Sequence, residues 1–133
     1  MTIELNHTIV LSRDKRASAE FLASTLGLEV GAPTGPFLPV ATGNGVTLDF
    51  ADSQQPITPQ HYAFLVSEEE FDVIFARIQQ AEITYYAQPT LEGRGEINHR
   101  EGGRGTYFLD PNGHYLEILT RAHGTGSGAK AAA

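Results

Sequence analysis

The chain has 133 residues, of which 41% are hydrophobic and 19% charged, a composition typical of one globular domain. Its formal net charge of −7 disfavours nucleic acid and anionic membranes as partners, and the lack of cysteine excludes thiol catalysis, thiolate metal sites and disulfides. No apolar run reaches membrane-spanning length and no signal-like segment opens the chain, so we expect a cytoplasmic protein.

The first half of the chain is predicted to hold one helix among short strands. Residues 3–11 have the alternation of a strand, and residues 14–26 have helical spacing that ends at Gly27. Glycine and proline then separate two or three further short strands. These are expected near residues 28–31, 37–41 and 46–51.

The second half follows the same order. A strand at 61–66 precedes a helix whose start is marked by a capping box, Ser67 with Glu70. Its apolar residues recur at helical spacing, namely Phe71, Ile74, Phe75, Ile78 and Ala81. A strand near 83–87 and a glycine-rich loop then lead into a hairpin of residues 105–109 and 114–120, joined by the turn Asp110-Pro111-Asn112-Gly113.

The two halves align as a duplicated βαβββ unit. Residues 44–50 match residues 112–118 without a gap, and each half places a histidine in its first strand. Internal repeats of this kind outweigh local propensity when a fold is predicted. We expect a single domain over residues 1–122, with modules at about 3–52 and 59–121 and a flexible tail at 123–133.

Four residues at equivalent positions of the repeat have the chemistry of a metal site. Imidazoles and carboxylates suit divalent metals and leave positions open for substrate, so His7, His61 and Glu117 are predicted ligands of Fe, Mn, Ni or Zn. Asp49 is predicted as a fourth ligand or as a catalytic base. The alternatives are solvent-facing histidines, a solvated Asp49, and a Glu117 that pairs with Arg121 on the same strand face.

Other polar residues are candidates for substrate contacts. Tyr107 is predicted either to act catalytically, by donating a hydrogen bond to a substrate oxyanion, or to be a half-buried strand tyrosine with a hydrated hydroxyl. His114 and His123 are predicted to lie at the surface. The candidate substrate-binding residues are Arg104, Tyr115, Arg121, as a carboxylate clamp, and His99, as a mobile acid or base.

Three motifs together resemble the vicinal oxygen chelate superfamily. They are Asn-His at the start of the chain, H-Y-A-F at 61–64 and Y-F-x-D-P-N-G-H-x-L-E-I at 107–118. That superfamily includes glyoxalase I, ring-cleaving extradiol dioxygenases, fosfomycin-modifying transferases and bleomycin-binding proteins. The resemblance spans about residues 3–121 and implies an α+β fold, in which two βαβββ modules form a curved, partly open mixed β-barrel with the helices outside.

The resemblance also implies site residues and partners. By position, His7, His61 and Glu117 fall on the usual metal ligands, and Asp49 falls where glyoxalase-type members place a fourth acidic ligand. We expect a homodimer, because open sheet edges need covering. The resemblance implies two alternatives, a site formed within one chain or a site shared between chains, with His7 from one chain and His61 and Glu117 from the other.

Three function classes follow. The first is an enzyme that uses a divalent metal to bind a small substrate through its oxygens, with lyase, isomerase or dioxygenase chemistry through an enolate or oxyanion. The second is a metal-free protein that sequesters a small molecule, as in bleomycin resistance. The third is a fosfomycin-type thiol transferase, which two departures from that group's pattern disfavour. Ile9 replaces the hydroxyl residue expected two positions after the first histidine, and the loop EGGRGTY does not match the polar potassium- and phosphonate-binding loop.

Overall fold

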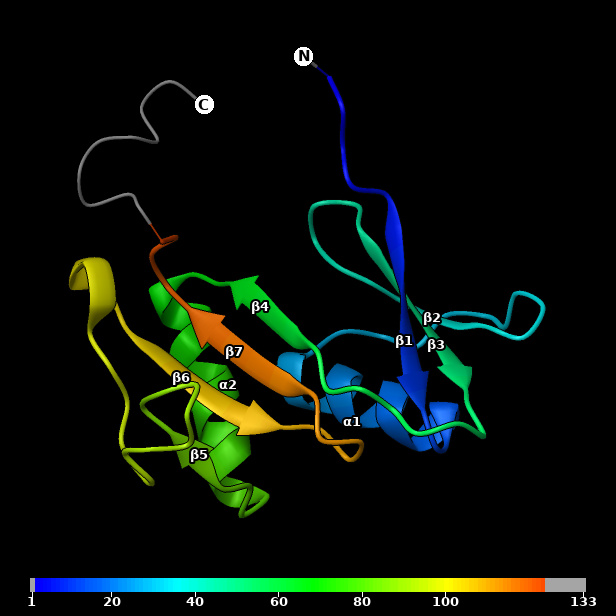
Figure 1. The fold of residues 1–133 in the computed structure, drawn as a ribbon. Helices are drawn as coiled ribbons and strands as arrows, with labels where there is room; N and C mark the ends of the chain where they lie inside the picture. The colour runs from blue at the N-terminus through cyan, green and yellow to red at the C-terminus, as the bar shows by residue number, and fades with distance from the viewer. Residues whose placement is uncertain (1, 124–133) are drawn as a thin grey trace. The chain divides into compact units, whose positions relative to one another are not determined.

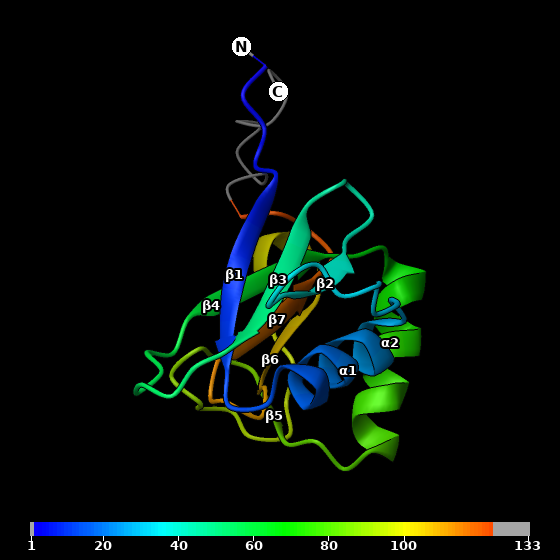
Figure 2. The same ribbon diagram turned by 90° about the vertical axis from the view of Figure 1, so that its right-hand side faces the viewer.

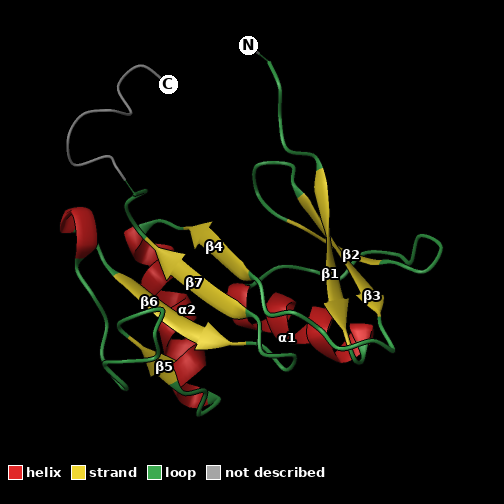
Figure 3. Cartoon of the chain, in the orientation of Figure 1, coloured by secondary structure: helices red, strands yellow, loops and turns green. Residues whose placement is uncertain are grey.

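The computed structural model describes residues 2–123, which form two helices, seven strands and one 3₁₀ turn (Figure 3). The chain divides into two compact units. Unit 1 runs to Thr58 and includes Asp110–Asn112, whereas unit 2 holds Pro59–Leu109 and residues 113–123. The predicted α+β class is confirmed. Of the predicted tail, residues 124–133 lie outside the described part of the chain. Within residues 2–123, no helix is long and apolar enough to cross a membrane.

Unit 1 is a three-stranded mixed sheet with one helix packed on it (Figure 2). The strand order is β1-β3-β2, with β1 parallel to β3 and β2 antiparallel to β3. The elements are β1 (His7–Ser12), α1 (Lys15–Leu26), β2 (Leu38–Ala41) and β3 (Thr47–Asp52).

Local signals explain the ends of helix α1. The Asp14 side chain accepts hydrogen bonds from two backbone amides of the first turn, and Gly27 ends the helix in the left-handed region at φ 78°. The strand predicted at residues 28–31 is reduced to a single bridge between Val30 and Val40.

The hairpin turn contributes to unit 1 through one side chain. Asn112 accepts a hydrogen bond from the backbone amide of Arg13 through Oδ1 at 2.9 Å, and its Nδ2 donates to Ser18 Oγ at 2.8 Å. Within the turn, Asp110 Oδ1 accepts from the Asn112 backbone amide at 2.8 Å. This turn was predicted from the sequence, but its attachment to β1 and α1 was not.

Unit 2 is a four-stranded mixed sheet, and helix α2 lies across one of its faces (Figure 1). The strand order is β4-β7-β6-β5, with β4 parallel to β7 and the other pairs antiparallel. The elements are β4 (His61–Leu65), α2 (Glu68–Gln80), β5 (Tyr85–Tyr86), the 3₁₀ turn η1 (Arg100–Gly102), β6 (Gly105–Leu109) and β7 (Tyr115–Leu119).

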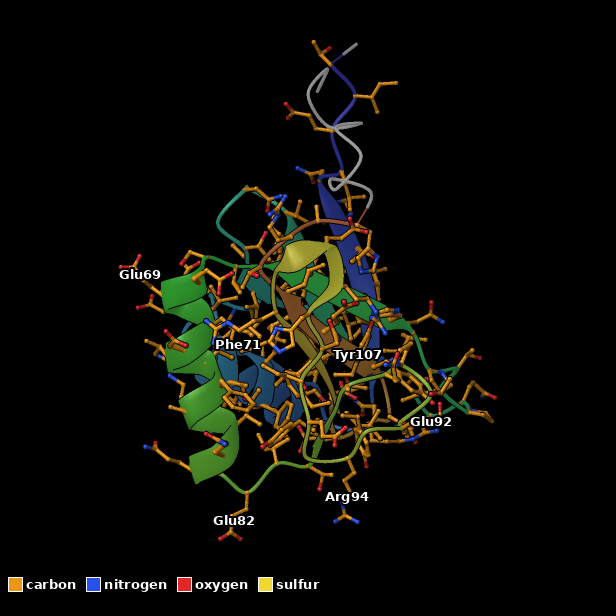
Figure 4. All side chains as sticks on the ribbon, turned by 90° about the vertical axis from the view of Figure 1, so that its left-hand side faces the viewer. Glu69, Phe71, Glu82, Glu92, Arg94 and Tyr107 are labelled. Atoms are coloured by element: carbon orange, nitrogen blue, oxygen red, sulfur yellow. The ribbon has the colours of Figure 1, made fainter. Side chains whose placement is uncertain are left out.

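Helix α2 confirms both of its sequence signals. Ser67 Oγ accepts from the Glu70 amide at 3.0 Å, and Glu70 Oε1 accepts from the Ser67 amide at 2.8 Å, so the capping box is complete. Figure 4 shows Phe71 lying inside the unit, whereas Glu69 at the start of the helix points outward. Of the predicted apolar stripe, Phe71, Ile74 and Ile78 are buried and Phe75 is half-buried, whereas Ala81 is exposed at the C-terminal cap.

Strands β1-β3-β2 of unit 1 match β4-β7-β6 of unit 2 in order, direction and register, and the single bridge between Val30 and Val40 takes the place of β5. In each, the first-strand histidine lies opposite the residue two positions before the carboxylate, Thr47 for Asp49 in unit 1 and Tyr115 for Glu117 in unit 2. Because side chains alternate along a strand, each histidine shares a sheet face with its carboxylate. The duplication inferred from the sequence is therefore present in the fold, although unit 1 has one strand fewer than the predicted βαβββ pattern.

Candidate metal and substrate site

Glu117 is a buried carboxylate at the centre of the unit 2 sheet. It lies on β7, between β4 and β6, and the residue is only 1% exposed. Its Oε1 lies 2.9 Å from His61 Nε2, and its Oε2 lies 3.6 Å from His123 Nε2. Burying a carboxylate requires such partners. Within residues 2–123, its ion pairs are with these histidines and not with Arg121.

His61 faces the same side of the sheet from the start of β4. Its side chain remains 46% exposed while its Nε2 reaches the buried Glu117 carboxylate. Its ring centroid lies 5.7 Å from that of Tyr107. The pair thus has one buried partner, Glu117, and one partner, His61, that remains accessible from solvent.

Tyr107 completes this face from β6, where it lies opposite Glu117 in the antiparallel register. The residue is 1% exposed, and its hydroxyl accepts a hydrogen bond from Arg100 Nη1 at 2.5 Å. Burial and the negative charge of Glu117 raise the pKa of the Tyr107 phenol. The prediction of a half-buried tyrosine with a hydrated hydroxyl was therefore wrong.

Arg100 and Gln88 belong to this site and were missed by the sequence analysis. Arg100, in η1, also donates from Nη2 to Gln88 Oε1, and its Cζ lies 5.5 Å from the centroid of the Tyr107 ring. No periodicity or motif points to an arginine in a glycine-rich loop. The only available signal was its position seven residues before a strand tyrosine, which does not specify a contact.

The unit 1 candidates lie on an equivalent face with a different environment. His7 is exposed, and its Nδ1 lies 2.8 Å from Oδ1 of the neighbouring Asn6. Asp49 is half-buried, and the residue opposite it on β2 is Pro39. In the part of the chain that the structure describes, no three histidine, aspartate or glutamate side chains converge into a group that could hold a metal.

Arg104 is held by helix α2. Its guanidinium forms ion pairs with Glu68 at 2.8 Å and Asp72 at 2.9 Å, and its Cζ lies 4.4 Å from the Phe71 ring centroid. Burial opposes the charged form, but hydrogen bonds to the two carboxylates hold the pKa of Arg104 above its usual value. Hydrogen bonds from Thr120 and Arg104 lower the pKa of Glu68. These contacts join the start of β6 to α2, and a substrate role for Arg104 stays a prediction.

The histidines predicted to lie at the surface divide into two cases. His114 is 1% exposed, its Nδ1 accepts from the Gln60 amide at 3.0 Å, and its ring meets Tyr62 edge-on, so that prediction was wrong. The imidazole satisfies a backbone amide beside β4, a role set by the tertiary structure. His123 has a side chain that is 58% exposed, as predicted, although it lies near Glu117.

The remaining candidates lie around the edge of unit 2. Tyr115 is half-buried on β7, and His99 is exposed where η1 begins. Arg121 is exposed, and its stem covers Gly103 so closely that a Cβ at that glycine would lie 2.4 Å from Arg121 Cγ. A direct contact with a substrate stays a prediction for all three.

Comparisons with known proteins agree with the resemblance noted in the sequence. The structure of Oxidase ChaP-H2 superposes with a TM-score of 0.93 at 63% identity, covering 95% of this chain and 99% of that one. Oxidase ChaP-H1 gives a TM-score of 0.90 at 53% identity, covering 92% and 99%. Glutathione transferase FosA of Serratia marcescens is 34% identical over 125 residues, 89% of this chain and 81% of that protein. With residues 4–118 matching the family profile, the chain belongs to the Glyoxalase/Bleomycin resistance protein/Dioxygenase superfamily.

Proposed function

We propose that the protein is a metal-dependent enzyme that oxidises a small substrate bound through its oxygens, the dioxygenase branch of the expected chemistries. The observation that carries this proposal is the buried Glu117 carboxylate bonded to His61, in a chain 63% identical to a protein named an oxidase. A 2-His-1-carboxylate set with open positions is typical of non-haem iron oxygenases.

The donor atoms of unit 2 fit a divalent metal. His61 Nε2 and Glu117 Oε1, at 2.9 Å from each other, supply two of the three protein ligands, and His7 is proposed as the third because of its equivalent position in unit 1. When bound, the metal would supply Lewis-acid polarisation of substrate oxygens and, if it is iron or manganese, redox chemistry. Zinc has no redox chemistry and suits an oxidase less well.

The other residues are assigned by what they can do from their positions. Tyr107 is proposed to donate a hydrogen bond to a substrate oxygen, since it lies opposite Glu117 in a water-poor environment. Asp49 is proposed as a further ligand or as a base that moves a proton. Arg121, Tyr115 and His99 are proposed to contact the substrate at the periphery.

The experiment that tests the proposal is the metal content of the purified protein, measured by elemental mass spectrometry beside the His61→Ala variant. We expect near-stoichiometric iron or manganese that the variant loses, and dioxygen uptake by the metal-loaded wild type with catechols or hydroxyketones. An unchanged metal content in the variant would overturn the ligand assignment. Protein that holds no metal, and takes none up on reconstitution, would favour a metal-free sequestering role.

A fosfomycin-type transferase is the second candidate, because the chain is 34% identical to Glutathione transferase FosA. It predicts glutathione addition to the epoxide of fosfomycin, stimulated by manganese and potassium. Ile9 and the loop before β6 remain departures from the expected pattern. A product of this addition would move the assignment from oxidation to thiol transfer.

A homodimer is also proposed. Both β1 and β4 are terminal strands of their sheets, and open edges of this kind are usually covered. Large apolar side chains on these two strands are exposed, namely Ile9, Leu11 and Leu65. Burying them against a second copy of the chain is the expected solution.

A further inference from the structure

Arg100 makes three contacts with uncharged groups of unit 2. Its Nη1 donates to the Tyr107 hydroxyl at 2.5 Å, its Nη2 donates to Gln88 Oε1, and its Cζ lies 5.5 Å from the Tyr107 ring centroid. The side chain is half-buried, and the hydroxyl that it contacts belongs to a residue that is 1% exposed. The positive charge is thus held against the oxygen of a buried phenol.

The backbone that carries Arg100 is held in place as well. Asn98 Oδ1 accepts from the Arg100 amide at 3.2 Å, and Asn98 Nδ2 donates to the Ala87 carbonyl at 2.8 Å. The next residue, Glu101, has a φ of 57°, a left-handed conformation that non-glycine residues adopt rarely. A strained turn fixed by side-chain hydrogen bonds indicates that the position of Arg100 is specified by the loop.

The chemistry of a guanidinium fixes the direction of the Tyr107 hydrogen bonds. Arginine has donors and no acceptor, so the Tyr107 oxygen accepts at this contact and its single proton must point elsewhere. Glu117, which lies opposite Tyr107 on the neighbouring strand, is the acceptor with which the phenol shares a hydrogen bond. A cation on the accepting side also strengthens the phenol as a donor. Tyr107 is therefore oriented as a donor toward the Glu117 side.

We propose that Arg100 is a positioning residue that holds Tyr107 as a hydrogen-bond donor to an oxygen anion of the substrate, an enolate or a phenolate. This inference rests on the proposed function, in which Glu117 serves as a metal ligand and its oxygens are engaged. The Tyr107 proton is then donated to the substrate oxygen that carries negative charge.

The test uses 4-nitrocatechol, an acidic oxygen chelator, whose binding to zinc-loaded full-length protein is followed by its absorbance. We expect Arg100→Gln and Tyr107→Phe each to weaken binding about tenfold, and the double variant to lose no more than about a further twofold, because both remove one hydrogen-bonded unit. Arg100→Lys, which keeps the charge and a donor, should restore most of the affinity.

Arg94→Gln is the matched control. It removes the same charge from the same loop, but Arg94 is exposed and in Figure 4 its side chain points outward, away from Tyr107. It should bind the probe within about twofold of wild type. If Arg100→Gln does not fold, Arg100→Met, which also removes the charge and the donors, replaces it in the cycle with Tyr107→Phe.

The outcomes separate this inference from the proposed function. If Arg100→Gln binds the probe as tightly as wild type, the proposed role of Arg100 is wrong. The same holds if the affinity losses of the two single variants multiply in the double variant. Either result leaves the proposed function untouched. A wild-type protein that takes up no zinc would overturn the proposed function and this inference with it. Zinc stoichiometry is therefore measured for every variant before the probe is added.

Discussion

The two units present the same backbone positions but fill them differently. In unit 2 the carboxylate is a glutamate that is 1% exposed, with His61 on one neighbouring strand and Tyr107 on the other. In unit 1 the carboxylate is the half-buried Asp49, and the position equivalent to Tyr107 is Pro39. Proline offers neither a hydroxyl nor a backbone donor at that position.

This difference shows that a duplicated backbone provides equivalent positions, while the side chains decide which of them form a site. His61 reaches its carboxylate at 2.9 Å, whereas His7 lies 2.8 Å from Asn6. We infer that unit 2 forms the main part of the site and that unit 1 contributes at most individual ligands. Each prediction below tests or refines that asymmetry, beginning with the largest expected effect.

Exchanging each carboxylate for its amide should separate the units most clearly. Glu117→Gln removes a proposed, buried metal ligand and should lower the metal affinity by more than ~100-fold. Loss of a residue that only hydrogen-bonds to a metal ligand lowers the affinity by about 10- to 100-fold. Asp49→Asn should lower it by about tenfold or less. Metal titrations monitored by competition with a chromophoric chelator would measure both constants. Equal losses in the two variants would contradict the asymmetry.

Mixing two ligand variants tests whether unit 1 and unit 2 of different chains form one site. His7→Ala and His61→Ala should each lack metal. An equimolar mixture that is unfolded and refolded together should recover about a quarter of the metal sites if the sites are shared. About half of the dimers are then mixed, and each mixed dimer has one intact site of two. Elemental analysis after gel filtration provides the measurement. A mixture without metal would show that each chain forms its own site.

The helix caps should behave alike, in contrast to the carboxylates. Asp14→Ala in unit 1 and Ser67→Ala in unit 2 each remove a side-chain acceptor from a helix start and should lower the unfolding free energy by about 1 kcal/mol. Urea denaturation followed by circular dichroism gives the two values. A loss in only one variant would mean that the units also differ in their local scaffold.

The smallest expected effect concerns the phenol that unit 1 lacks. The pKa of Tyr107 is raised by burial and by Glu117, above the usual value of 10.0, so its stabilising contribution is complete below pH 10 and disappears as the pH rises through the folded-state pKa. Unfolding free energies measured from pH 8 to pH 11 should fall less steeply for Tyr107→Phe than for wild type. Parallel curves would contradict the assignment of this titration to Tyr107.

Local chemistry made much of the fold predictable. Three features depend only on residues close together in the sequence and could therefore be predicted from it. They are the capping box at Ser67, the end of helix α1 at Gly27 and the turn at residues 110–113. The ungapped alignment of residues 44–50 with residues 112–118 also predicted that Asp49 and Glu117 occupy equivalent positions. The strand registers agree, because each carboxylate lies two residues beyond the partner of its first-strand histidine.

The sequence by itself therefore determined the duplication, the family and the equivalence of Asp49 with Glu117 and of His7 with His61. Only the tertiary structure decided that His114 is buried, that Arg104 pairs with α2, and that Arg100 reaches Tyr107. The physical reason is the distance along the sequence between the residues that interact. Strand alternation and caps depend on neighbouring residues, whereas burial and contacts across a glycine-rich loop depend on which distant segments the completed sheet brings together.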